Sequence, residues 1–141
     1  MKDIHNKILA AELIAPNIYD GDIPSAPVDL VDYEAAEVLL HIGAGGIPFT
    51  DTARIDFKLM HSEDGSNYSA VKSSDLVGSP PVGEGGIIKS LTAAHATASL
   101  DQFGYIGGKR YLKLLADFSG THETGTPIAA LVVKGQPHQM R

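Results

Sequence analysis

Strict two-residue alternation of apolar and charged side chains is the feature that most constrains this chain. Between Ala53 and His61, Ile55, Phe57 and Leu59 alternate with Arg54, Asp56 and Lys58. Successive side chains of a β-strand point to opposite faces, so one face of this segment turns to a core and the other to water. That division is typical of an antiparallel sheet with one solvated side.

Further segments of strand character lie between turn residues. They cover Glu37–Ile42, Tyr68–Val71, Arg110–Ala116 and Ile128–Val133. Asp64-Gly65 predicts a hairpin turn, and Ile128–Val133, apolar on both faces, suits a strand central to a sandwich. Residues 87–99 fit a strand pair or a short helix, and a strand is favoured. We therefore predict an all-β fold, an antiparallel β-sandwich or jelly-roll-like domain of about seven strands over residues 31–141.

Residues 1–30 show little periodicity and are predicted to form an N-terminal arm. Asp3 is a candidate cap for a short helix, whereas residues 17–30, with Pro24 and Pro27, suit an extended strap; a β-arm is the third alternative. Such an arm packs on a neighbouring molecule, and deletion of residues 1–24 is expected to leave a folded core. The candidate partner-binding residues are Ile4, Ile8, Ile14, Ile18, Tyr19, Ile23 and Tyr68.

Composition limits the classes of function. The 141 residues suit one domain, there is no cysteine for a disulfide, and the net charge of −6 disfavours nucleic acid as a partner. No apolar run reaches the roughly 20 residues that span a bilayer, and the first residues lack the apolar core of a signal peptide. We expect a protein made in the cytoplasm that binds neither nucleic acid nor membrane.

Candidate catalytic and metal-binding patterns are weak. The six histidines lack the spacing of a metal site, the residues around Asp64 lack the ligand spacing of a calcium loop, and Gly104–Arg110 lacks the order of a phosphate loop. Ser119, His122 and Glu123 lie close in sequence, but a short loop rarely supplies a triad. We expect no catalytic residue, metal or cofactor; a small hydrolase built around His122 and Glu123 is a rival hypothesis.

Four segments resemble a group of small structural proteins of tailed bacteriophages and gene-transfer-agent-like particles. The first pairs Val28-Asp29-Leu30 with Tyr33-Glu34-Ala35-Ala36, and the second is the hairpin from His61 to Gly65 followed by Tyr68 and Val71. The third, Gly104-Tyr105-Ile106-Gly107-Gly108-Lys109-Arg110-Tyr111-Leu112, resembles a G-Y-I-G-x-K-R-Y-V/L signature. The fourth is Ala129–Pro137. The resemblance covers roughly residues 28–137.

This resemblance implies a virion structural protein, a capsid decoration or cement protein on the outer surface of the phage head. It would bind the major capsid protein, stabilise its lattice and form homotrimers by analogy with threefold sites of icosahedral shells. The resemblance does not separate head from tail, and the alternative is a tail- or fibre-associated module that binds a host-surface glycan, with Tyr68 as an aromatic platform. For Lys109 and Arg110, pairing with acidic groups of the same chain is favoured over pairing with the capsid.

Overall fold

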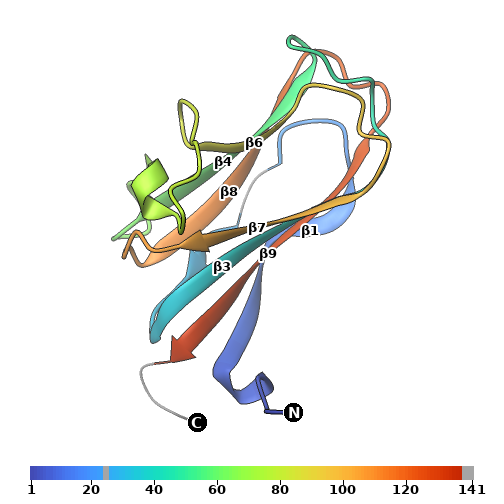
Figure 1. The fold of residues 1–141 in the computed structure, drawn as a ribbon. Helices are drawn as coiled ribbons and strands as arrows, with labels where there is room; N and C mark the ends of the chain where they lie inside the picture. Colours follow the sequence, from blue (N-terminus) through green and yellow to red (C-terminus); the bar gives the residue numbers. More distant parts are fainter. Residues whose placement is uncertain (24–25, 138–141) are drawn as a thin grey trace.

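The chain folds into two antiparallel β-sheets that pack face to face (Figure 1). The computed structural model describes residues 1–23 and 26–137, so Pro24 and the last four residues of the predicted domain lie outside the described residues. The elements are η1 (His5–Lys7), β1 (Ile8–Tyr19), β2 (Val28–Asp29), β3 (Tyr33–Ile42), β4 (Arg54–Ser62), β5 (Ser69–Ala70), η2 (Ser73–Asp75), β6 (Ile87–Leu91), β7 (Ser99–Tyr105), β8 (Tyr111–Ser119) and β9 (Thr126–Pro137).

The predicted all-β sandwich is confirmed. One sheet has the strand order β1-β9-β3-β7, and the other has the order β2-β8-β4-β5 with β6 also paired to β4. The described residues form nine strands where about seven were predicted. The two additional strands are β1 and the two-residue β2, which both lie in the segment predicted as an arm.

The alternation along β4 builds the shared core. Ile55, Phe57 and Leu59 are fully buried between the sheets, where they face the inner side of the other sheet, including Val38 and Leu40 of β3. Removal of these apolar surfaces from water is the main term that holds the two layers together.

The turn after β4 forms as predicted. The carboxylate of Asp64 accepts hydrogen bonds from the backbone N–H groups of Ser66 and Asn67, both at 2.8 Å. These hydrogen bonds hold the pKa of Asp64 well below its usual value. Gly65 adopts a φ of 78°, the left-handed conformation in which glycine is least strained.

Residues 87–105 form two strands, β6 and β7, which belong to different sheets. The favoured strand interpretation of residues 87–99 is therefore confirmed only at its ends. The segment between Leu91 and Ser99 is irregular and carries the chain from one layer to the other.

The N-terminal segment is part of the sandwich and not a separate arm. The predicted short helix is limited to η1, where Asp3 accepts a hydrogen bond from the His5 N–H at 2.8 Å. From Ile8 the chain forms β1, whose register with β9 runs from Ile8↔Gly135 to Tyr19↔Thr126. The boundary expected at residue 30 is thus corrected.

Two buried residues explain why β1 belongs to the domain. Leu13 and Ile14 are each only 2% exposed and lie in the core. Deletion of residues 1–24 would remove both side chains and an entire strand, so the expectation of an intact core after this truncation is also corrected.

Candidate functional site

The candidate partner-binding residues fall into two groups. Ile4 and Ile18 are 65% and 67% exposed, and Ile8 is 37% exposed. Ile14 and Ile23, by contrast, are 2% and 6% exposed and pack in the core, so they are not available to a partner. Their prediction as contact residues was wrong because the surrounding segment is a strand with an inner face.

The two tyrosines among the candidates are half-buried. The hydroxyl of Tyr19 donates to the Ala15 carbonyl at 2.6 Å. The Lys113 ammonium lies 4.1 Å from the ring centroid of Tyr68 and covers one side of that ring. Neither ring presents the open aromatic platform that stacking on a sugar requires.

The exposed isoleucines line a free sheet edge. Among the described strands, β1 pairs with β9 alone, so its other side is an edge of the four-stranded sheet. The sequence reasoning missed Leu9, which is 50% exposed. We call Ile4, Ile8, Leu9 and Ile18 the edge row.

The two halves of β1 differ as an edge. Its second half has register irregularities between Glu12 and Ile14 and between Ile14 and Asn17, and it contains Pro16. Bulges and proline are devices that block pairing with another strand. The first half, from Ile8 to Glu12, has neither, and its backbone is suited to receive a strand of a partner protein.

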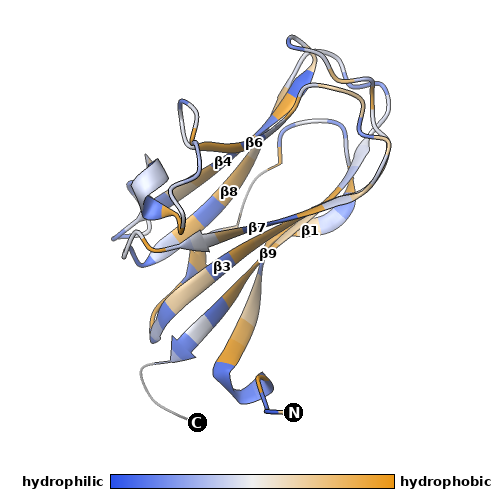
Figure 2. Cartoon of the chain, viewed as in Figure 1, coloured by the Kyte–Doolittle hydropathy of each residue, from blue (hydrophilic) through white to orange (hydrophobic). Residues whose placement is uncertain are grey.

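The outer side of the four-stranded sheet is apolar. Residues that share this side are related by the register of β1, β9 and β3, for example Ala10↔Val133 and Leu39↔Leu131. Figure 2 shows long orange stretches along β1 and β9. We call this surface the β9 face, and its apolar members include Ile8, Ala10, Ile18, Leu39, Leu100, Pro127, Ala129, Leu131 and Val133.

The β9 face is not flat. A hollow of about 320 Å³ lies on it, lined by Pro16, Ile18, His41, Pro127 and Ala129 among others. The fold has only two layers, so this face meets solvent, and Leu39, Ala129, Leu131 and Val133 are half-buried by their neighbours in the sheet. An apolar hollow in an apolar sheet surface is suited to receive aliphatic side chains.

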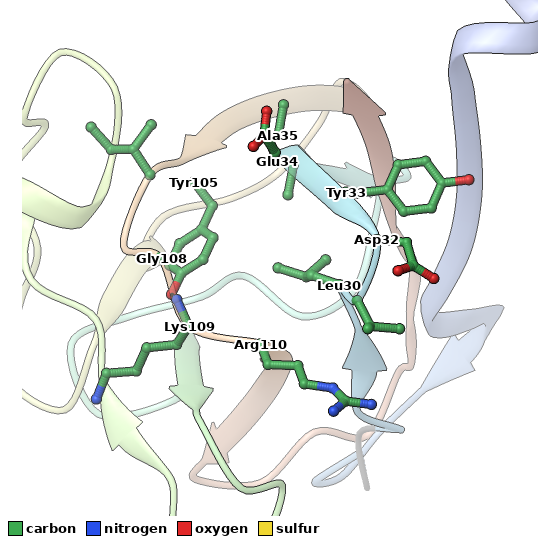
Figure 3. A pocket seen from close by; sticks show the side chains of 12 residues that line it. Leu30, Asp32, Tyr33, Glu34, Ala35, Tyr105, Gly108, Lys109 and Arg110 are labelled. Carbon is green, nitrogen blue, oxygen red and sulfur yellow. Dashed lines mark hydrogen bonds between the residues drawn. The ribbon is translucent and has the colours of Figure 1, made fainter. Parts of the chain in front are cut away.

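A second hollow, of about 480 Å³, lies where β3 begins and β7 ends (Figure 3). It joins two of the segments that carry the resemblance, residues 28–36 and 104–112. Its base includes the buried side chains of Leu30 and Tyr105, and Lys109 and Arg110 stand at its wall, pointing in opposite directions.

Two cations near this hollow, Arg110 and Lys134, contact groups of the same chain, so the predicted internal pairing is confirmed for Arg110. Arg110 binds both carboxylate oxygens of Asp29 at 2.8 Å, as the sequence predicted. This hydrogen bonding holds the pKa of Asp29 below its usual value. Lys134 donates to the Asp29 carbonyl at 3.3 Å and lies 5.1 Å from the ring centroid of Tyr33. These contacts tie β2, β3, β8 and β9 together.

A buried network links the two sheets next to this hollow. The Tyr105 hydroxyl accepts a hydrogen bond from the Lys109 N–H at 3.1 Å and lies 2.8 Å from Nδ1 of His61. The Nε2 atom of His61 lies 4.0 Å from the Asp75 carboxylate. Burial lowers the pKa of His61 and raises that of Tyr105 to about 12.

His122 is held in an aromatic setting. Its ring lies 4.9 Å from that of Phe118, and its Nε2–H donates to the Ser119 carbonyl at 2.9 Å. Its Nδ1 is buried and has no hydrogen-bond partner among the described residues. The contact with Ser119 is to the backbone and not to the hydroxyl, and Glu123 is exposed, so this loop does not present a Ser–His–Glu relay.

The described part of the chain contains no group of three or more side chains suited to hold a metal ion. Within residues 1–23 and 26–137, no helix has the length and hydropathy needed to cross a bilayer. Comparison with known proteins found no matching family model, no matching curated protein and no matching solved structure.

Proposed function

We propose that this chain is a virion structural protein that decorates the outside of a tailed-phage head, binds the major capsid protein and stabilises its lattice. It is made in the host cytoplasm and acts as a homotrimer on the capsid surface. The resemblance of residues 28–137 to small phage structural proteins motivates the proposal. The observation that carries it is the edge row, which lines an open strand edge.

The edge row suits attachment to a protein lattice. Ile4, Leu9 and Ile18 are at least half exposed, although burial of each such side chain would gain roughly 1.5–3 kcal/mol. The neighbouring strand edge offers backbone hydrogen bonds to an extended segment of the partner. A trimer carries three such edges, and contact with several capsid subunits at once multiplies modest affinities.

Phage heads that lack the protein provide the test. The purified full chain is mixed with these heads, and bound protein is measured by co-sedimentation and located by image reconstruction. We expect saturation at hundreds of copies per head, spread over the shell. The double variant Ile4→Asp/Leu9→Asp, which places two charges on the edge row, is expected to reduce binding at least tenfold.

Val77→Asp is the matched control. Val77 is 62% exposed, close to the 65% of Ile4, but it lies outside the edge row. The proposal is overturned if the full chain does not bind the heads, if only a handful of copies bind at the portal or tail, or if the double variant binds as well as Val77→Asp.

A further inference from the structure

We propose that the β9 face packs against a second copy of this chain and is the main contact of a homo-oligomer. This inference rests on the proposed function for the existence of the oligomer. The β9 face shares Ile8 and Ile18 with the edge row, whereas Ile4 and Leu9 lie outside the β9 face and remain for the capsid. Leu9 lies on the core side of its sheet, because it pairs with Lys134 and through it with the buried Ala36.

The composition of the β9 face resembles the centre of a permanent interface. Strand β9 lies between β1 and β3, and its outward positions from residue 127 to 135 are all apolar or glycine: Pro127, Ala129, Leu131, Val133 and Gly135. The ionisable groups on this side, Glu12, Glu37 and His41, belong to the strands that flank β9. Depletion of charge at the centre is the compositional signal of a protein interface.

The size of the face is sufficient for a stable contact. Four strands spaced by about 4.8 Å and about ten residues long, at about 3.3 Å per residue, give a projected area on the order of 600 Å². A standard interface buries about 800 Å² on each partner. Side-chain relief and the hollow beside Ile18 add to the projected value, so one sheet face reaches the required range.

A second copy suits this face better than the capsid does. A decoration subunit exists free before it meets a particle, and a monomer rarely exposes an apolar patch larger than a few hundred Å². A partner that is present from synthesis onward covers the face at all times, and only another copy of the chain meets that condition. Apolar sheet faces also pack on one another, typically at about 10 Å.

Light scattering coupled to size-exclusion chromatography tests the proposal on the full chain. We expect a molar mass that is a multiple of the 14.9 kDa of one chain, three times that value for the proposed trimer. Leu131→Arg, which charges the centre of the β9 face, is expected to elute at 14.9 kDa. Leu115→Arg is the matched control, because Leu115 is also a half-buried, outward-facing leucine of a strand interior to its sheet, β8.

A second variant guards against misfolding. Ala129→Arg adds a long cation to the β9 face and removes no packed side chain, and it is expected to dissociate the oligomer in the same way. The inference is overturned if the wild-type chain is a monomer, if both arginine variants of the β9 face keep the wild-type mass, or if Leu115→Arg dissociates it equally. Binding of the wild-type chain to heads despite a monomeric mass would overturn this inference and leave the proposed function standing.

Discussion

The outer faces of the two sheets differ in the chemistry of their side chains. On the five-stranded sheet, Arg54 pairs with Asp56 at 2.7 Å, and Lys58 pairs with Asp117 at 2.9 Å. On the four-stranded sheet, the central strand places alanine, leucine and valine at the corresponding outward positions. We call the first surface the β8 face. The outer face of the five-stranded sheet carries charges that remain in water, whereas that of the four-stranded sheet carries apolar side chains whose burial by a partner is favourable.

This difference suggests that the β8 face contributes to the stability of the monomer and the β9 face to its assembly. The β8 face contributes hydrogen bonds and ion pairs to the folded monomer, so its variants are expected to change the free energy of unfolding. The β9 face contributes apolar surface that only a partner buries, so its variants are expected to change molar mass more than monomer stability. Three measurements on the polar side and on the link between the sheets sharpen this comparison.

The largest expected effect is that of Asp56→Ala on the β8 face. The Asp56 side chain is 12% exposed and accepts from Arg54 and from the Ser90 hydroxyl. Burial alone would raise its pKa, but these hydrogen bonds outweigh burial and lower it. Loss of the carboxylate removes the acceptor that both donors share, leaves Arg54 with its 3.2 Å hydrogen bond to the Ser90 hydroxyl, and is expected to cost about 1–3 kcal/mol in urea unfolding. A change in the unfolding free energy smaller than the error of the measurement would contradict a stabilising role for the β8 face.

The next effect is a pH dependence at the link between the sheets. Because the pKa of His61 is lowered in the folded chain, the unfolded chain binds more protons below about pH 6.5. The contribution of a neutral His61 is therefore complete above pH 6.5 and is lost as the pH falls toward the folded pKa. The expected slope is at most about 1.4 kcal/mol per pH unit.

His61→Gln provides the comparison for that titration. This variant carries no titrating imidazole, so its unfolding free energy is expected to change less between pH 7 and pH 5 than that of the wild type. Identical pH profiles for the two proteins would show that His61 is not held neutral by the fold.

The smallest expected effect is that of Asp117→Asn. The Asp117 side chain is 42% exposed, and its ion pair with Lys58 is open to solvent and salt. Such pairs contribute about 0.2–1 kcal/mol, and water screens this one toward the lower end. We expect a loss of no more than about 0.5 kcal/mol that disappears in 1 M salt, and a larger, salt-independent loss would contradict the assignment to a surface ion pair.

The sequence predicted the parts of the fold in which local pattern and tertiary packing agree. Ile55, Phe57 and Leu59 are buried as their spacing requires, and Asp64-Gly65 turns the chain as predicted. For the N-terminal segment the sequence leaves helix, β-arm and strap open, because two register irregularities near Ile14 break the two-residue period and Pro16 suggests an end where the strand continues.

The β9 face shows a different limit of sequence reasoning. Residues 128–133 are apolar on both faces and predict a strand central to a sandwich. Val132 is indeed buried, but Leu131 and Val133 face outward and remain half-buried. A continuous apolar run indicates that both faces will be covered, and it does not tell whether the cover belongs to the same chain. The exposure of Leu9 could not be predicted either, because an apolar residue in the sequence does not tell whether its own chain covers it.

The pairing of β1 with β9 has a consequence for synthesis on the ribosome. Ile8 lies opposite Gly135, so the hydrogen bonds between β1 and β9 form only after β9 has been translated. Gly135 lies 127 positions after Ile8, and at about 5–20 residues per second this separation takes on the order of 6–25 s to translate. During that interval the apolar β1 segment has no place in the sheet, so chaperone occupancy of ribosome-bound chains should be highest before β9 emerges.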